Sequence, residues 1–175
     1  MPLDHLWATW RSAYVSKIAD TRALPSPEDA GGRSLFERIL AGADEEGDEA
    51  AGIVHRGSTC FVLLNLFPYT SGHLMVLPKR AVSDLHELGD EEHVELWSTV
   101  RDAVAALRSA FSCEAVNVGL NLGAAAGGSQ SDHIHVHCVP RWQGDANFIG
   151  VTAETRVLPI SLAEAGAMLR AVWPA

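Results

Sequence analysis

The sequence predicts an α+β fold in which a five-stranded, mostly antiparallel sheet packs against one long helix. Two observations support this prediction. Short apolar runs follow one another across turn residues, which is typical of hairpins and meanders. Residues 90–111 repeat apolar side chains every three or four positions, which indicates a long amphipathic helix. With 175 residues, the chain is long enough for one domain with its own core.

The expected strands are short apolar or alternating segments between turn residues. Gly57 and Ser58 separate the first two strands, which should form a hairpin. Pro78 ends the third strand, because proline cannot donate a hydrogen bond within a sheet. The last two strands follow the long helix. The five are expected at residues 52–56, 60–65, 73–77, 115–121 and 133–139.

The long helix is expected to begin with Asp90 as its N-cap. Ser161 and Glu164 form a capping-box pattern, which predicts a last helix through Leu169 and Val172. The face of the long helix that repeats every three or four positions, and is therefore expected to be buried, consists of Val94, Trp97, Val100, Val104, Leu107 and Phe111.

The N-terminal part of the chain is expected to be an extension of one single domain. Aromatic residues at helical spacing predict a short helix over residues 4–16, followed by a mobile loop over residues 20–33. The acidic residues 44–49 are expected to form a solvated turn. We therefore divide the chain into an extension (1–51), a core (52–148) and a C-terminal strand and helix (149–175).

Composition excludes several classes of function. A net charge of -9 argues against nucleic-acid binding, which needs an excess of lysine and arginine. The first 16 residues contain no apolar signal-peptide core, and no run of about 18 apolar residues predicts a membrane span. Cys60, Cys113 and Cys138 are widely spaced among apolar neighbours, which favours reduced thiols and a cytoplasmic protein.

Three histidines at every second position are the strongest functional signal in the sequence. On a strand, His133, His135 and His137 would share one face, while the apolar residues between them would point into a core. Packing alone gives no reason to align three imidazoles. A metal site, an acid–base or nucleophilic site, and a structural histidine ladder are the three interpretations that remain open.

The segment from His133 to Val139 resembles the histidine-triad signature, His-φ-His-φ-His-φ-φ with φ apolar, at all seven positions. The glycine-rich loop before it and the segment from Asn65 to Pro78 are also similar to this superfamily, so that the resemblance spans residues 52–147. Residues 140–148 and 6–14 resemble, more narrowly, its bacterial diadenosine tetraphosphate phosphorylase-like branch.

The resemblance implies a catalytic role for each histidine. His135 would attack the α-phosphorus of a nucleotide and form a covalent nucleotidyl-histidine. His137 would donate a hydrogen bond to a non-bridging oxygen or to the leaving group, and His133 would hold the geometry. The implied substrate-binding residues are Asn65 at the ribose, Asn121 at a phosphate, and the loop residues Gly128, Ser129, Gln130 and Ser131, whose amides and hydroxyls would face the phosphate.

Some positions depart from the pattern of the superfamily. Where several relatives bind structural zinc together with the first triad histidine, this chain has Ser34, Glu37 and Ala81, so we expect no metal and no cofactor. His137 stands where many transferases and phosphorylases have glutamine, which favours hydrolysis, whereas residues 144–148 resemble the phosphorylases. Phosphate as a co-substrate would need a cationic cradle, for which Lys79, Arg80 and Arg141 are candidates.

The function that the resemblance favours is cleavage of a dinucleoside polyphosphate, preferably diadenosine tetraphosphate, by phosphorolysis through His135. The first alternative is a hydrolase of dinucleoside polyphosphates or nucleoside phosphoramidates that uses the same intermediate. The second is a nucleotide-binding module without turnover. The resemblance also implies a homodimer with a continuous sheet.

Overall fold

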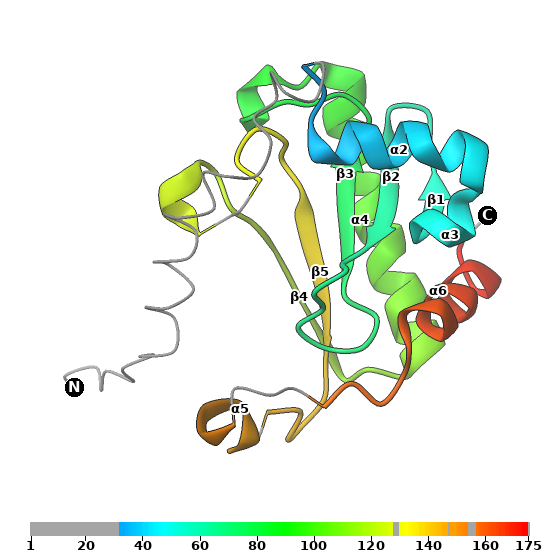
Figure 1. Cartoon of the computed structure of the whole chain (residues 1–175), viewed down its shortest axis with the longest axis vertical. Helices are drawn as coiled ribbons and strands as arrows, with labels where there is room; N and C mark the ends of the chain where they lie inside the picture. The colour runs from blue at the N-terminus through cyan, green and yellow to red at the C-terminus, as the bar shows by residue number, and fades with distance from the viewer. Residues whose placement is uncertain (1–31, 128–129, 147, 154–156, 175) are drawn as a thin grey trace.

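A five-stranded antiparallel sheet forms the centre of the computed structural model, which describes residues 32–127, 130–146, 148–153 and 157–174 (Figure 1). The strands lie in the order β1-β2-β3-β5-β4. The predicted fold class is therefore confirmed. The strand bounds are β1 Ile53–Arg56, β2 Cys60–Leu64, β3 Leu74–Pro78, β4 Ala115–Leu120 and β5 Val136–Arg141.

The predicted strands are all present, but β5 begins three residues later than expected. Its pairing with β3 and β4 starts at Val136, which lies opposite Val76 and Leu120. His133 and His135 consequently lie in the segment that leads into β5, and only His137 lies within the strand. β3 likewise begins at Leu74, one residue after His73.

Helices cover both faces of the sheet (Figure 1). α4 (Asp90–Phe111) packs on one face, against a cluster that includes Val62, Val76, Val136 and Cys138. α2 (Leu35–Glu46) packs on the other face, against Phe61, Leu63, Met75 and Leu77. Alternating residues of β1, β2 and β3 therefore belong to two separate cores, as expected of strands buried on both sides.

The bounds of α4 agree with the prediction, but its buried face is rotated. Gly89, not Asp90, is the N-cap, and Asp90 is the first helical residue. Val94 is 68% exposed and Trp97 is 38% exposed, so their predicted burial is wrong. The helix turns its smaller side chains toward the sheet, which allows close approach. Its buried residues are Leu96, Thr99, Val100, Ala103, Ala106 and Leu107.

The predicted acidic turn at residues 44–49 is wrong, because this segment ends α2 and begins α3 (Asp48–Ala51). Ser34 and Glu37 form a capping box at the start of α2: the Glu37 amide donates to the Ser34 hydroxyl, and the Glu37 carboxylate accepts from the Ser34 amide. The sequence carries this pattern, Ser-x-x-Glu, directly before the apolar residues Ile39 and Leu40.

The predicted last helix is confirmed, since Ser161 caps α6 (Leu162–Ala171), whose C-cap is Val172 and which packs against β1 and α4. The C-terminal strand expected after residue 148 is not found among the described residues of that segment. α5 (Ile149–Thr152) and the 3-10 turns Leu85–Glu87 and Ala124–Ala126 complete the described elements. The helix expected at residues 4–16 and most of the loop at 20–33 lie outside the described residues. The division of the chain at residues 51 and 148 stays a prediction.

Within the described residues, no helix combines the length and apolar character needed to cross a membrane. Cys60, Cys113 and Cys138 are all buried and free. Burial raises the pKa of Cys60 to about 11 and that of Cys138 to about 12, so both remain thiols at neutral pH.

Candidate active site

The three triad histidines lie on the α2 side of the sheet. The Phe36 ring of α2 lies 5.4 Å from the His133 ring and 5.3 Å from the His135 ring, between centroids. The His135 and His137 rings are 4.9 Å apart. Ile134 and Val136, between them, belong to the core on the α4 side. The alternation expected from the sequence is therefore present, although two of the three histidines precede the strand.

His135 is held in one tautomer by the backbone. Its Nδ1 lies 2.9 Å from the carbonyl oxygen of His133. A carbonyl can only accept, so Nδ1 must carry the proton, and the neutral ring then has its lone pair on Nε2. The residue is 7% exposed, and most of its surface is therefore shielded from water. The arrangement makes Nε2 the nucleophilic atom of this ring.

His137 is part of a second chain of hydrogen bonds. The amide of Tyr69 donates to Nδ1 of His73 at 3.1 Å, and the Asn65 side chain lies 3.3 Å from the same nitrogen. Nδ1 of His73 is thus an acceptor, and its Nε2 carries the proton. That Nε2 lies 2.9 Å from Nδ1 of His137 and donates to it. The proton of neutral His137 is therefore on Nε2, which makes this atom a hydrogen-bond donor.

Burial favours the neutral forms of His133 and His137. Burial, with a smaller contribution from the nearby His135, lowers the pKa of His137 to about 4. Burial is also the largest cause of the lowered pKa of His133. A neutral His135 ring thus presents a lone pair on Nε2 beside the Nε2–H donor of neutral His137. Group transfer at a phosphorus atom requires a nucleophile and an adjacent hydrogen-bond donor.

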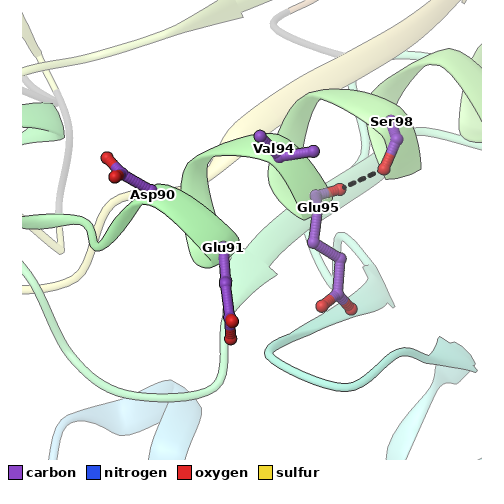
Figure 2. Close-up of a pocket in the computed structure, with 5 residues that line it drawn as sticks. All are labelled: Asp90, Glu91, Val94, Glu95 and Ser98. Carbon is purple, nitrogen blue, oxygen red and sulfur yellow. Dashed lines mark hydrogen bonds between the residues drawn. The ribbon is translucent and has the colours of Figure 1, made fainter.

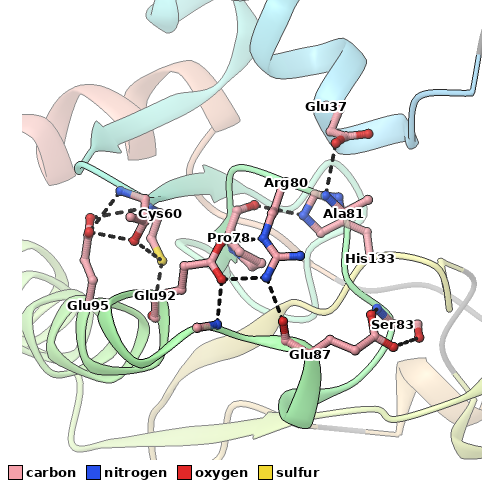
Figure 3. A network of polar contacts seen from close by, with 12 residues as sticks. Glu37, Cys60, Pro78, Arg80, Ala81, Ser83, Glu87, Glu92, Glu95 and His133 are labelled. Atoms are coloured by element: carbon pink, nitrogen blue, oxygen red, sulfur yellow. Dashed lines mark hydrogen bonds and ion pairs between the residues drawn. The ribbon is translucent and has the colours of Figure 1, made fainter.

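His133 is fully buried and is held at both ring nitrogens. Its Nε2 donates to the carbonyl oxygen of Pro78 at 2.8 Å (Figure 3). The Ser34 hydroxyl lies 2.7 Å from Nδ1, which is left as the acceptor. The ring therefore connects the end of β3 to the start of α2.

The four positions that correspond to a zinc site in some relatives come together in this structure. Ser34 bonds to His133, and the Glu37 carboxylate accepts from the Ala81 amide at 3.0 Å (Figure 3). This donor set does not fit zinc, because both nitrogens of His133 are engaged and Ala81 offers only a backbone amide. In the part of the chain that the structure describes, no group of three or more histidine, cysteine or acidic side chains is arranged to hold a metal ion.

The expected substrate-binding residues are placed as follows. Asn65 accepts from the Phe67 amide at 3.0 Å through its side-chain oxygen, so it makes a turn as well as contacting His73. Asn121 and Gln130 are half-buried, and Ser131 is exposed, in the connection between β4 and β5. Gly128 and Ser129 lie outside the described residues. The structure connects Asn65 to the triad through His73.

His73 is the site residue that our sequence analysis missed. It lies at the start of β3, is fully buried, and contacts the Tyr69 and His137 rings. The available signal was a histidine directly before a continuous apolar strand, where a buried imidazole needs partners. Its partner His137 is 64 residues away, and nothing in a single sequence indicates such a pairing.

Two of the three cations considered for a phosphate cradle are engaged in ion pairs. Arg80 pairs with Glu92 at 2.7 Å and donates to the Glu87 carbonyl (Figure 3). Arg141 donates to both carboxylate oxygens of Asp145, at 2.6 and 2.8 Å. These hydrogen bonds lower the pKa of Asp145 to about 2. The remaining candidate, Lys79, lines a hollow of about 290 Å³ whose other charged lining residues are Arg33, Arg56, Glu37 and Asp44.

A larger hollow, of about 450 Å³, lies on the first turns of α4 (Figure 2). Asp90, Glu91 and Glu95 are among its lining residues, and such a set of carboxylates repels phosphate. The Glu95 carboxylate has a structural role, since it accepts from both the amide and the hydroxyl of Thr59. This hollow is therefore poorly suited to a phosphate compound, and the triad is the stronger candidate site.

Comparison with known proteins agrees with this geometry. The model of the HIT domain family matches residues 46–144. Two proteins named AP-4-A phosphorylase, from two strains of Mycobacterium tuberculosis, are each 40% identical over 174 residues, covering 98% of this chain and 85% of the relative. A Schizosaccharomyces pombe protein named bis(5'-nucleosyl)-tetraphosphatase (asymmetrical) is 34% identical over 53% of this chain and 50% of its own length.

Among solved structures, a zinc-bound histidine triad family protein from Mycobacterium smegmatis is similar to this chain with a TM-score of 0.63. Its sequence is 29% identical, and the match covers 79% of this chain and 91% of that one.

Proposed function

The chain belongs to the HIT domain family, and from this membership we propose that it cleaves dinucleoside polyphosphates, with diadenosine tetraphosphate as the preferred substrate, by phosphorolysis. The observation that carries the proposal is the pair of fixed tautomers: Nε2 of His135 holds a lone pair beside Nε2–H of His137. The names of the two mycobacterial relatives support this choice of substrate and reaction.

In the first step, Nε2 of His135 forms a bond to the α-phosphorus, and the bond from that phosphorus to the bridging oxygen breaks. ATP leaves, and an adenylyl group remains on the histidine. The ring becomes positively charged, and its Nδ1–H donates to the carbonyl of His133, which stabilises that charge. Nε2–H of His137 donates a hydrogen bond to oxygen in the transition state, where negative charge develops.

In the second step, an oxygen of inorganic phosphate attacks the adenylyl phosphorus, and the bond to Nε2 breaks. The products are ADP and a neutral His135 ring. No cofactor is needed in either step, and phosphate serves as a co-substrate. Gly128, Ser129, Gln130 and Ser131, in the loop before the triad, are the proposed phosphate-binding residues together with Asn121, and Asn65 is the proposed ribose ligand.

Hydrolysis through the same intermediate is the second candidate. Two observations favour it: a histidine occupies the third triad position, and Arg80 and Arg141 are committed to Glu92 and Asp145. Water would then replace phosphate in the second step and release AMP. The yeast relative named as a tetraphosphatase supports this alternative.

The test is to incubate the purified protein with diadenosine tetraphosphate, with and without phosphate, and to identify the nucleotides by chromatography. The His135→Ala variant is the matched control. ADP and ATP that form only with phosphate are the expected result. If AMP and ATP, or two molecules of ADP, form in phosphate-free buffer, the protein is a hydrolase and phosphorolysis is contradicted. Bound nucleotide without products would replace both by a binding module.

We also propose that the protein is a homodimer whose sheets join through β4. β4 is an edge strand in the described sheet, and Val118 on it is 44% exposed. An exposed edge with an apolar side chain favours pairing with another strand. Light scattering should give twice the chain mass for the natural protein and a lower mass for Val118→Lys; a monomeric natural protein contradicts the proposal.

A cytoplasmic location is part of the same proposal. It is supported by the three buried free thiols, which are typical of a reducing compartment. Cell fractionation with an antibody against the protein tests it, and recovery outside the cytosolic fraction contradicts it.

A further inference from the structure

The first turn of α2 contacts the triad through two side chains. Ser34, at the N-cap, approaches Nδ1 of His133, and Phe36, two residues on, contacts the rings of both His133 and His135. Both α2 residues are almost fully buried. This turn is distant in sequence from the triad, since Ser34 precedes His133 by 99 positions.

The Ser34 hydroxyl has a defined direction. Because Nε2 of His133 donates to the Pro78 carbonyl, Nδ1 has a lone pair, and the hydroxyl must donate its proton to it. The oxygen of the same hydroxyl accepts from the Glu37 amide at 3.1 Å. One hydroxyl therefore caps α2 and holds the histidine at the same time.

His133 is fixed from three sides by neighbouring elements. Ser34 holds one ring nitrogen and Pro78 the other, at 2.7 and 2.8 Å. The Ile134 amide, which belongs to the same peptide group as the His133 carbonyl, donates to the carbonyl of Val82 at 2.8 Å. The carbonyl of His133 is thus part of a peptide group with little freedom to move.

This carbonyl is the acceptor that fixes His135. The His133 carbonyl oxygen accepts a hydrogen bond from Nδ1–H of His135, with 2.9 Å between oxygen and nitrogen. This bond determines where Nε2 of the His135 ring points. A shift of His133 would move the attacking atom, and displacement by about 1 Å at a reacting centre costs on the order of 100-fold in rate. The Phe36 ring limits the remaining tilt of both imidazoles.

We propose that Ser34 is a positioning residue for catalysis: through His133 it holds the nucleophile His135 in its reactive orientation. The activity readout of this inference rests on the proposed function, because it uses turnover of diadenosine tetraphosphate. A second readout, on the protein without substrate, does not.

Ser34→Ala and Ser34→Gly remove the hydroxyl with different consequences for the helix. Alanine is a poor N-cap, whereas glycine costs only a few tenths of a kcal/mol there. Ser34→Thr keeps a hydroxyl. The matched control is Ser161→Ala, which removes the equivalent N-cap of α6, where the Ser161 hydroxyl accepts from the Glu164 amide at 3.2 Å.

We expect kcat to fall about 10-fold in both Ser34→Ala and Ser34→Gly, with KM changed less than about 2-fold. Ser34→Thr should recover most of the rate. Ser161→Ala should keep the rate of the natural protein although it loses a helix cap. A normal kcat in Ser34→Gly, or an equal loss in Ser161→Ala, would overturn the positioning role.

The second readout is nitrogen NMR of histidine-labelled protein without substrate. In Ser34→Ala and Ser34→Gly, the Nδ1 resonance of His133 should move, and the ring resonances of His135 should move or broaden with it. Ser161→Ala should leave both unchanged. His135 resonances that stay in place in a folded Ser34 variant would overturn the inference. If the natural protein cleaves no dinucleotide, the proposed function fails while this measurement still decides the role of Ser34.

Discussion

His73 and His137 are joined by a 2.9 Å hydrogen bond between Nε2 of the first and Nδ1 of the second. The bond connects the residue before β3 to the second residue of β5, and the Tyr69 amide, which donates to Nδ1 of His73, fixes its direction. Hydrogen bonds from neighbouring groups therefore fix the tautomers of both histidines. The backbone of the loop before β3 thus determines which nitrogen of neutral His137 carries the proton.

Replacing His73 should lower the rate of the reaction. In His73→Ala, Nδ1 of His137 loses its donor, and the proton of His137 is no longer held on Nε2. We expect kcat to fall on the order of 10–100-fold with a small change in KM, because the lost interaction acts in the transition state. Steady-state kinetics of diadenosine tetraphosphate cleavage measures this.

The control is His86→Ala, since the His86 side chain is 80% exposed and pairs with Asp84 at the surface. Its kcat should equal that of the natural protein. Circular dichroism establishes that His73→Ala is folded. A folded His73→Ala with normal kcat would show that the relay has no catalytic role.

His135→Ala should abolish turnover and leave nucleotide binding largely intact, because it removes the attacking atom and few other contacts. Calorimetry with a non-cleavable dinucleotide measures binding, and mass spectrometry of the quenched natural enzyme should find an adenylyl group on His135. An adduct on another residue, or turnover by the variant, contradicts the assignment of the nucleophile.

The buried histidines should make the protein less stable in mild acid. Burial lowers the pKa of His137 to about 4 and also lowers that of His133, whereas an unfolded histidine has a pKa of about 6.5. The unfolded state therefore binds more protons below about pH 6.5. The contribution of these neutral histidines to the free energy of unfolding is fully present above that pH. It is lost as the pH falls toward about 4.

From the shift of His137 alone, the loss should approach roughly 3 kcal/mol, or less if the site opens before it charges. Urea unfolding at pH 7.5, 6 and 5 measures the free energy of unfolding. His137→Gln should show a smaller loss over this range, because one buried imidazole is missing. Equal losses in the two proteins would mean that His137 is not held neutral by the fold.

Replacing Gly72 or Gly42 by alanine should change the free energy of unfolding in opposite directions. Gly72 has φ +85°, and a Cβ there would overlap the Phe111 ring, so Gly72→Ala should destabilise the protein by more than about 1 kcal/mol. Gly42 lies exposed in α2, and a Cβ there meets no described atom within 4 Å, so Gly42→Ala should stabilise by roughly 0.5–1 kcal/mol. Thermal unfolding compares them; a stabilised Gly72→Ala would contradict the geometry of this turn.

The sequence predicted the sheet well because its strands are short apolar runs separated by glycine, proline and asparagine. It also predicted that the triad histidines share one side, since this follows from the period of an extended chain. The sequence analysis did not predict α2, which begins at the Ser34–Glu37 capping box. It assigned only the acidic end of this helix, within residues 44–49, and assigned it as a turn.

Other features depend on contacts between distant segments. The rotated face of α4 reflects how closely Ala103 and Ala106 allow the helix to approach the sheet, which periodicity does not reveal. The role of His73 depends on a partner 64 residues away, and that of Ser34 on one 99 residues away. Such pairings become visible only when the chain is folded.

The position of α2 has a practical consequence for dissecting this protein. The family match begins at residue 46, yet Ser34 and Phe36 lie upstream of that boundary and touch the triad. A fragment trimmed to residues 46–144 would retain all three triad histidines while exposing two of their rings and leaving Nδ1 of His133 without its donor. Such a fragment would contain the signature of the family but would lack Ser34 and Phe36, which hold His133 and His135 in place.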